Sequence, residues 1–377
     1  MSFSLTDPAV ASLLGLSVRE AKRGVRGANP LVGAVIADAF GQVVATGHHR
    51  GAGTPHAEAD ALSNLAAAQE LAARRQNEQT PLDPAPADPG PLDPETLTMF
   101  VTLEPCNHTG RTGPCSHAIV ESGIGRVVYA VPDATDRASG GAAHLVVNGV
   151  EVIAGESISE QWVAESRALN ARWFRAQSEA RPITSLHLAQ TLDANIAAVD
   201  GTSQWITGDA SRQHSHSIRA RVDAIIVGTG TIFADNPQLT ARDAGGELAP
   251  RQPLRVAMGH RDVPDTARIR GTGSFEQFHT HDPREVLSEL KARGVDHAMI
   301  EGGSSIATAF LAADLVDEIW LYQAPKFLGR GRSALDDLGI TSLSQALELE
   351  LDDVDGPAVR QLGNDVLLHL TPRHEDK

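Results

Sequence analysis

The chain is poor in cysteine, in basic residues and in long apolar runs. It has 2 cysteines among 377 residues, and its formal net charge is −16. No apolar run approaches the roughly 18 residues of a membrane-spanning helix, and no secretory segment opens the chain. Without a basic stripe, binding to nucleic acid phosphates is disfavoured. We therefore expect a cytoplasmic protein in a reducing compartment, with a small-molecule ligand and no membrane or nucleic-acid partner.

Both cysteines fall in one stretch of sequence. Cys106 and Cys115 follow a strand-like run that ends at Leu103, and His56 lies upstream with Glu58 two residues after it. One imidazole and two thiolates suit zinc, and three protein ligands leave the fourth tetrahedral position open for water, which is the catalytic arrangement. Glu58 is placed to exchange protons with that water, as in the H-x-E…P-C…C layout of zinc-dependent deaminases. The sequence therefore predicts one catalytic zinc ion per chain.

Other interpretations of these residues stay open. The cysteines could be buried thiols that act as small apolar side chains. A structural zinc site could close its fourth position with His108 or His117. A disulfide is disfavoured in a reducing compartment. His48 and His49 are adjacent on a predicted strand and point to opposite faces, so they are not expected to share a metal ion.

The length suggests two domains. Residues 1–155 alternate strands and helices and predict an α/β/α sandwich, with both cysteines at the start of a helix. A proline-rich insertion at 76–95 interrupts it, because repeated prolines exclude a helix or a central strand. Residues 156–181 predict a connecting helix, and 182–377 predict a second α/β domain. The expected helices are 9–23 (capped by Asp7), 57–75, 116–122, 158–177 and 212–221. The expected strands are 33–36, 43–47, 99–103, 126–131, 149–153, 183–189, 254–258 and 297–301, together with a strand that runs into a glycine turn within 224–231.

Two glycine turns stand out in the second domain. Residues 224–231 and 297–307 each run from an apolar strand into glycines, and the second continues into a helix. Such a turn presents backbone N–H groups to a phosphate. There is no G-x-G-x-x-G pattern, so a Rossmann dinucleotide site is not supported.

The motifs of the first domain resemble the deaminase half of the RibD family of bifunctional riboflavin-biosynthesis enzymes. The eight-residue gap between the cysteines contains Gly-Arg-Thr, whereas cytidine and tRNA-adenosine deaminases usually show P-C-x-x-C. The resemblance implies a cytidine-deaminase-like fold, a diaminopyrimidinone ribosyl phosphate substrate that Asn29 contacts, His56, Cys106 and Cys115 as zinc ligands, and Glu58 as the proton shuttle. The matching stretches are Asn29-Pro30-x-Val32-Gly33, Gly47-x-His49, Pro55-His56-Ala57-Glu58 and Glu104-Pro105-Cys106-x-His108-x-Gly110-Arg111-Thr112-x-Pro114-Cys115.

The second domain resembles the reductase half of the same family, which has a dihydrofolate-reductase-like fold and uses NADPH. The matching stretches are Ser203-x-Trp205-Ile206-Thr207, Val227-Gly228-x-Gly230-Thr231-x-x-x-Asp235-Asn236-Pro237-x-Leu239-Thr240-x-Arg242 and Glu301-Gly302-Gly303. The resemblance implies hydride transfer to C1′ of the ribose, with a pair of arginines on the substrate phosphate. The implied cofactor contacts are Ala189, Trp205, Thr231, Asp235, Gly303, Ser304 and Ser305, and the implied substrate contacts are Ser203, Arg219, Leu239, Arg242 and Glu301.

The chain departs from the family pattern at several positions. His187 replaces a lysine, Ala194 a glycine and Asn195 a cation, and Gly259-His260 replaces Asp-Ser or Asp-Gly. The usual Asp-Pro-Asn-Pro reads Pro132-Asp133-Ala134-Thr135-Asp136. We therefore expect a bifunctional homo-oligomer, dimer or tetramer, with an active deaminase and a weakened or lost reductase as the alternative. A zinc-stabilised interaction protein is disfavoured by the open ligand position, and a nucleic-acid deaminase by the charge and the cysteine gap.

Overall fold

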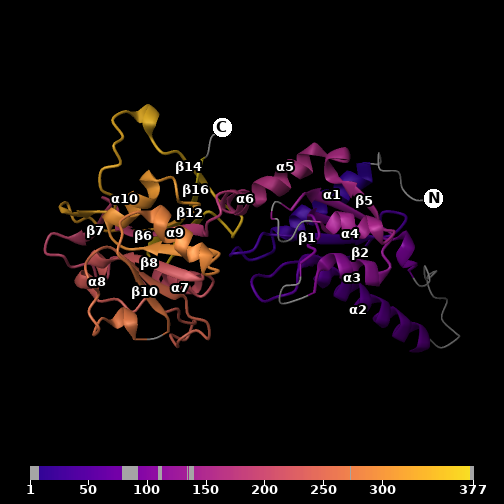
Figure 1. The fold of residues 1–377 in the computed structure, drawn as a ribbon, viewed down its shortest axis with the longest axis horizontal. Helices are drawn as coiled ribbons and strands as arrows, with labels where there is room; N and C mark the ends of the chain where they lie inside the picture. The colour runs from indigo at the N-terminus through magenta and orange to yellow at the C-terminus, as the bar shows by residue number, and fades with distance from the viewer. Residues whose placement is uncertain are drawn as a thin grey trace. The chain divides into compact units, whose positions relative to one another are not determined.

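The computed structural model describes residues 8–78, 92–108, 113–133, 135, 140–271 and 273–373. The chain divides into two compact units, Met1–Phe174 and Arg175–Lys377 (Figure 1). The expected helix cap at Asp7, most of the proline-rich insertion, the Gly-Arg-Thr stretch, Ala134 and Asp136 lie outside the described residues. None of the described helices is long and apolar enough to cross a membrane.

The first unit is built on a five-stranded sheet with the order β2-β1-β3-β4-β5. The strand β1 is antiparallel to both of its neighbours, while β3, β4 and β5 run parallel. Every residue of β1 and β3 is buried, as expected for the middle of a sheet that is covered on both faces. The strands are β1 (Gly33–Ala37), β2 (Val43–His48), β3 (Thr98–Leu103), β4 (Arg126–Val131) and β5 (Glu151–Ala154), and the helices are α1 (Pro8–Ala21), α2 (Ala57–Glu78), α3 (Cys115–Ser122), α4 (Gly141–Val147) and α5 (Glu160–Leu169).

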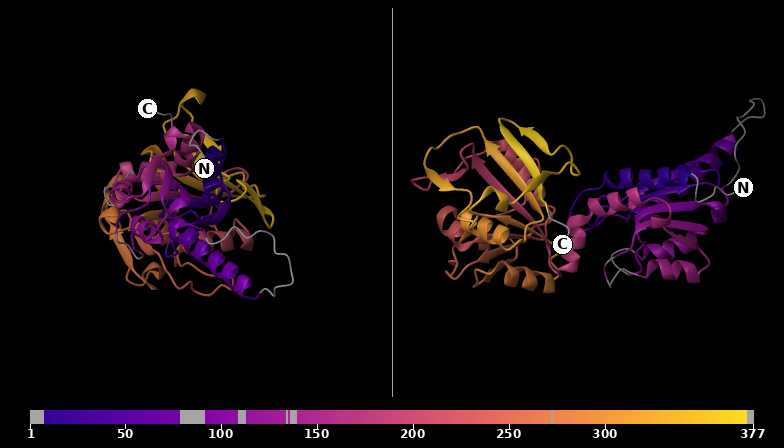
Figure 2. Two further views of the ribbon diagram at one scale, coloured as in Figure 1. Left: turned by 90° about the vertical axis from the view of Figure 1, so that its right-hand side faces the viewer. Right: turned by 90° about the horizontal axis from the view of Figure 1, so that it is seen from above.

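The second unit contains a nine-stranded sheet with the order β10-β9-β8-β11-β6-β12-β16-β14, with β15 paired to β16, and a two-stranded ribbon of β7 and β13. Strands β6 and β8 to β12 pair in parallel, and the C-terminal strands are antiparallel and lie together at one edge, in yellow in Figure 2. The strands are β6 (Ile183–Thr191), β7 (Asn195–Ala198), β8 (Ala224–Gly228), β9 (Leu254–Met258), β10 (Phe275–Phe278), β11 (His297–Glu301), β12 (Glu318–Ala324), β13 (Gly331–Ser333), β14 (Leu349–Leu351), β15 (Val359–Leu362) and β16 (Asp365–Pro372).

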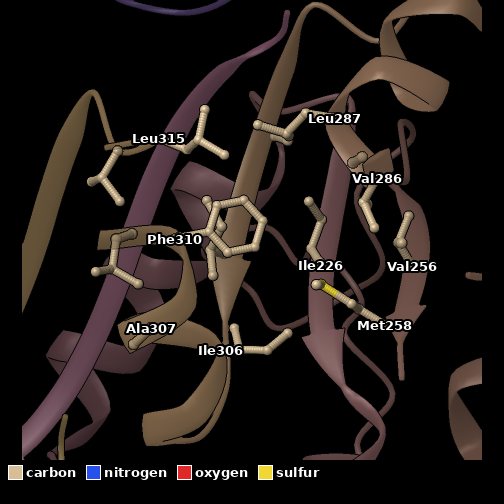
Figure 3. Packing of buried hydrophobic residues seen from close by; sticks show 14 of the residues in the cluster. Ile226, Val256, Met258, Val286, Leu287, Ile306, Ala307, Phe310 and Leu315 are labelled. Carbon is tan, nitrogen blue, oxygen red and sulfur yellow. The ribbon is translucent and has the colours of Figure 1, made fainter. Parts of the chain in front are cut away.

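Helices α9 (Pro283–Ala292) and α10 (Ser304–Ala312) pack on one face of this sheet. Figure 3 shows Ile306 and Phe310 of α10 against Ile226 of β8 and Met258 of β9. Phe310 is fully buried, and burying a side chain of that size stabilises the fold by about 1.5–3 kcal/mol. This core fixes β11 and α10, and therefore the glycine turn between them. Two further helices of the unit are α7 (Asp209–Arg219) and α8 (Thr229–Asp235).

The prediction of a single helix at 158–177 is wrong. Two helices occupy this stretch, α5 and α6 (Ala171–Ser178), and they are separated at Asn170. The buried Asn170 side chain accepts a hydrogen bond from the Leu31 N–H (2.7 Å) and donates one to the Leu31 carbonyl (2.9 Å). An asparagine that bonds a distant backbone in this way competes with the helical pattern, and the periodicity of the apolar residues does not show it.

Candidate functional site

The first candidate site is the metal-ligand cluster in the first unit. The His56 Nδ1 atom lies 3.5 Å from the Cys106 Sγ and 3.4 Å from the Cys115 Sγ. The donor atoms of the three residues lie within 4.8 Å of one another. Since Zn–N and Zn–S bonds are about 2.0–2.3 Å long, one zinc ion can bridge all three after a small adjustment. Two thiolates and an imidazole are also the donor set that zinc prefers, so the residues present fit the metal.

The alternative ligands do not join this cluster. Among the residues that the structure describes, only His56, Cys106 and Cys115 form such a group, and both cysteines are free thiols. The ring of His117 instead stacks on that of His144, with the ring centroids 4.2 Å apart. Three protein ligands leave one tetrahedral position for water or substrate, which is the catalytic arrangement and not the structural one.

The expectation that both cysteines begin a helix is wrong for Cys106. Cys115 is the first residue of α3, after Pro114 in an extended conformation, but Cys106 lies in the segment between β3 and α3. Its hydrogen bonds with Cys115 and His56 lower the pKa of the Cys106 thiol to about 4. The hydrogen bond with Cys106, together with burial, raises the pKa of the Cys115 thiol.

Glu58 lies on α2, in the turn that follows His56, and is 4% exposed. Burial, and then the nearby charge of Cys106, raise the pKa of the Glu58 carboxyl to about 7. A general acid–base works best with a pKa close to the operating pH. Glu58 can therefore both take up and return a proton beside the three ligands.

His49 connects Asn29 to the metal-ligand cluster. The Asn29 amide nitrogen is 2.9 Å from the His49 Nε2, and the His49 Nδ1 is 3.0 Å from the Pro55 carbonyl oxygen. The carbonyl can only accept, so the Nδ1 carries the hydrogen and the Nε2 accepts from the amide. The His49 ring meets that of His56 edge-on, with the centroids 5.5 Å apart. These contacts fix the Asn29 amide with its nitrogen toward His49, which leaves the amide oxygen as its acceptor group.

The second candidate site is a cavity of about 780 Å³ within the second unit. Strands β6 to β8, β11 and β12 line it together with the glycine turn before α10. Ser304 and Ser305 do not line it, since Ser304 is buried and the Ser305 hydroxyl donates to Asp336 (2.8 Å). The other expected contact residues do line it: Ala189, Ser203, Trp205, Arg219, Thr231, Asp235, Leu239, Arg242, Glu301 and Gly303.

The glycine turn packs closely against Thr231. Gly302 has a φ of +149°, and a Cβ atom on it would lie 3.2 Å from the Thr231 hydroxyl oxygen. The same hydroxyl accepts a hydrogen bond from the Gly303 N–H (3.1 Å). The Arg332 guanidinium lies 3.4 Å from where a Cβ atom on Gly303 would be. An open helix start next to a cation fits a phosphate-bearing cofactor.

The two arginines expected on the substrate phosphate are not equivalent. The Arg219 guanidinium makes a two-pronged pair with Glu301 (2.9 and 2.6 Å) and also donates to the Thr240 carbonyl (3.2 Å). Burial opposes ionisation of Glu301, but Arg219 outweighs it and lowers the pKa of the carboxyl. The charge of Arg219 is thus compensated inside the protein. Arg242 donates to the Gly246 carbonyl (2.7 Å).

Sequence reasoning missed several residues around this cavity. The Lys326 ammonium donates to the carbonyls of Trp205 (2.8 Å) and Ile206 (2.6 Å) and so holds the exposed Trp205 segment. The Tyr322 hydroxyl lies 2.9 Å from the His214 Nδ1. No motif marks these residues, because each acts through a contact between distant segments. The pairing of β12 with β6 is the signal that could have placed Tyr322, since it aligns Tyr322 with Ala189.

The turn that departs from the family pattern is held by several hydrogen bonds. Ala194 adopts a left-handed conformation with a φ of +56°. The Asp193 carboxylate accepts hydrogen bonds from the Gly329 N–H (2.7 Å) and the Thr191 hydroxyl (2.6 Å). The Asn195 amide donates to the Asp193 carbonyl (3.1 Å). These contacts maintain the turn although alanine is strained in this conformation.

Comparison with known proteins finds a matching protein family for each of the two units. The cytidine and deoxycytidylate deaminase zinc-binding region matches residues 10–131, and the RibD C-terminal domain matches residues 182–368. The chain is 38% identical to the riboflavin biosynthesis protein RibD of Mycobacterium tuberculosis (strain ATCC 25618 / H37Rv) over 97% of this chain and 98% of that protein. It is 39% identical to the RibD of Corynebacterium ammoniagenes over 87% of this chain and 91% of that protein.

Solved structures agree with these relatives. Acinetobacter baumannii RibD, form 1, has a TM-score of 0.73 and 31% identity, covering 98% of this chain and 100% of that one. A diaminohydroxyphosphoribosylaminopyrimidine deaminase/5-amino-6-(5-phosphoribosylamino)uracil reductase from Thermotoga maritima has a TM-score of 0.68 and 28% identity, covering 97% and 99%. The resemblance and the two α/β domains expected from the sequence are confirmed, and nothing favours a lost reductase half. The chain belongs to the RibD family of riboflavin biosynthesis and carries both its zinc-binding deaminase domain and its reductase domain.

Proposed function

We propose that the first unit hydrolytically deaminates 2,5-diamino-6-(5-phosphoribosylamino)pyrimidin-4-one, and that the second unit then reduces the ribosyl chain of the product to ribityl with NADPH. The observation that carries the proposal is the gathering of His56, Cys106 and Cys115 around one point, with the buried Glu58 beside them. The named activities of the Thermotoga maritima relative match these two steps.

In the deaminase unit, His56, Cys106 and Cys115 would hold zinc. When bound, zinc supplies a water of lowered pKa as the nucleophile for the ring carbon that carries the exocyclic amine. Glu58 takes the proton from that water and returns it to the departing ammonia, which its pKa of about 7 allows. The Asn29 amide oxygen accepts a hydrogen bond from the substrate, while His49 keeps the amide in this orientation.

In the reductase unit, the cavity would hold both NADPH and the deaminated product. When bound, NADPH supplies the hydride for C1′. The turn at Gly303, with Thr231 and Asp235, binds the nucleotide, and Trp205 and Ala189 line the cofactor side. Ser203, Leu239, Arg242 and the Arg219–Glu301 pair contact the substrate. Because Arg219 is neutralised by Glu301, Arg242 is the main cation for the ribose phosphate.

We also propose that the enzyme acts in the cytoplasm as a homo-oligomer, a dimer or a tetramer. The second unit exposes the apolar side chains of Phe327 (76%) and Leu343 (92%), and their substitution tests this proposal. Light scattering of the purified chain, with the loss of the higher mass on Phe327→Ser or Leu343→Ser substitution, tests this point.

The proposed function is tested by a paired assay on the purified protein with the diaminopyrimidinone ribosyl phosphate. Ammonia release and NADPH oxidation are followed together, and the zinc content is counted. The proposal predicts equal amounts of ammonia and NADP⁺ and one zinc ion per chain. Ammonia without NADPH oxidation contradicts the reductase step, and zinc without ammonia contradicts the deaminase step.

A further inference from the structure

Asp336 lies beside the start of α10, where the glycine turn meets the helix. The Ser305 hydroxyl donates a hydrogen bond to the Asp336 carboxylate (2.8 Å). Hydrogen bonds from Ser304 and Ser305 lower the pKa of the Asp336 carboxyl, and the charge of Arg332 acts in the same direction. The carboxyl is therefore ionised near neutral pH. The positive end of the helix dipole also favours an anion at this place.

The groups that hold this carboxylate are the ones that a cofactor phosphate would use. Proteins bind phosphate with hydroxyl donors, with the N–H groups of a helix start and with arginine. Gly303 and Arg332 line the cavity, and the exposed Ser305 follows Gly303 after one residue. A phosphate and the Asp336 carboxylate at one hydroxyl would place like charges side by side. The two anions therefore compete for the Ser305 hydroxyl.

The backbone of Asp336 is fixed, whereas its side chain is accessible. The Asp336 N–H donates to the Thr308 hydroxyl (2.8 Å). Leu335 and Leu338, on either side of it, pack against the core of the unit. Asp336 itself is exposed. A change of its side-chain rotamer, without movement of the segment, is therefore enough to release the Ser305 hydroxyl.

We propose that Asp336 holds the place of a cofactor phosphate until NADPH binds, and that the phosphate displaces it from the Ser305 hydroxyl. This inference rests on the proposed reductase function and deepens it. The carboxylate keeps the Ser305 side chain in place, and its displacement lowers the affinity for the cofactor, reduced and oxidised alike. The same contact accounts for the Ser305 side chain being held outside the cavity lining.

The test is the equilibrium binding of NADPH to the full chain, followed by the fluorescence of the cofactor. Asp336→Asn keeps the shape of the side chain but removes its charge, so the Kd for NADPH should fall about fivefold to tenfold, the size of about one net hydrogen bond. The matched control is Asp337→Asn, which removes the same charge from the next residue, where the carboxylate accepts from the Gly339 N–H (2.8 Å). Its Kd should change less than about twofold, because salt screens an exposed charge. Weaker or unchanged binding by Asp336→Asn, or an equal gain in both variants, would overturn the proposal.

The unfolding temperature separates this role from a structural one. Without added ligand, Asp336→Asn should unfold about 1–3 °C below the wild type, because the helix start loses its anion. Inorganic pyrophosphate should raise the unfolding temperature of Asp336→Asn at lower concentrations than that of the wild type. Equal concentrations would show that the carboxylate does not compete with phosphate and would overturn the proposal. If the wild-type protein does not bind NADPH at all, the proposed reductase function fails first, so the two failures are distinguishable.

Discussion

The metal-ligand cluster takes its residues from two short stretches of sequence, 56–58 and 106–115, whereas the reductase cavity takes its residues from strands, helices and turns spread between 187 and 332. The pKa of a buried carboxyl group is also shifted in opposite directions at the two sites. Glu58 lies near a thiolate, and its pKa is raised, while Glu301 lies against Arg219, and its pKa is lowered. The first carboxyl can exchange a proton near neutral pH, and the second is a fixed negative charge.

The contrast shows that burial alone does not set the role of an acidic residue. Desolvation raises the pKa of both carboxyls, and the neighbouring charge decides the outcome. For Glu58 the neighbouring charge is that of Cys106, and for Glu301 it is that of the Arg219 guanidinium at the end of α7. The deaminase step requires the first arrangement, and a stable substrate pocket requires the second.

The largest effect is expected when the proton carrier of the first site is removed. Glu58→Gln keeps the size and the ligands but cannot shuttle a proton, so ammonia release should fall about 10²–10⁴-fold. NADPH oxidation with the deaminated intermediate and the zinc content should not change. Normal ammonia release by this variant would show that Glu58 does not carry the proton.

The fixed charge of the second site is tested by Glu301→Gln. This change leaves the largely buried Arg219 without its counter-charge (side chains 18% and 14% exposed). We expect the unfolding free energy of the second unit to fall by about 3 kcal/mol, measured by urea unfolding. The matched control is Glu348→Gln, which breaks an exposed pair with Arg373 (65% and 55% exposed) and should cost about 0–1 kcal/mol. Equal losses in both variants would contradict the assigned burial.

The stability of the second unit should depend on His187 below pH 6.5. The folded chain holds this imidazole neutral down to a pKa of about 3, whereas the unfolded chain takes up a proton near 6.5. The unfolded state therefore binds more protons between these values, and stability falls as the pH falls, by about 1.4 kcal/mol per pH unit for this one group. Urea unfolding at pH 7.5 and 5.5 should show a smaller loss in His187→Leu than in the wild type. Parallel losses would contradict a neutral His187.

The smallest effect is expected at the turn that departs from the family pattern. Ala194→Gly relieves a left-handed alanine and should stabilise the second unit by about 0.5–1 kcal/mol. Ala180 has a similar φ of +49°, so Ala180→Gly should act in the same direction. Ala198→Gly, in the strand β7, is the opposite control and should destabilise by about 0.5–1 kcal/mol. Destabilisation by Ala194→Gly would show that the strain is relieved by other contacts.

Much of the fold and of the metal-ligand cluster can be predicted from local patterns in the sequence. The apolar runs at 126–131 and 254–258 coincide with β4 and β9, and the structure brings together the three expected zinc ligands. Two cysteines, a histidine and their spacing are enough because metal ligation tolerates few alternatives. Gly123, which follows the helix 116–122, has the left-handed conformation of a helix C-terminus, so that end was also readable.

Contacts between distant segments could not be predicted. The break at Asn170 depends on a backbone 139 residues away, and the pairing of Arg219 with Glu301 spans 82 residues. The sequence showed two arginines for one phosphate, but it did not show that one of them is neutralised. The same holds for Lys326, which supports the Trp205 segment from 121 residues away. Such pairings are set by the sheet order, which the strand patterns leave open.

We infer that one chain holds two chemically separate sites, of which only the first depends on a metal. Removal of zinc with a chelator, followed by both assays on the same sample, tests it most directly. Ammonia release is expected to stop and to return when zinc is added back, while NADPH oxidation with the deaminated intermediate continues throughout. Loss of both activities together, or of neither, would contradict it.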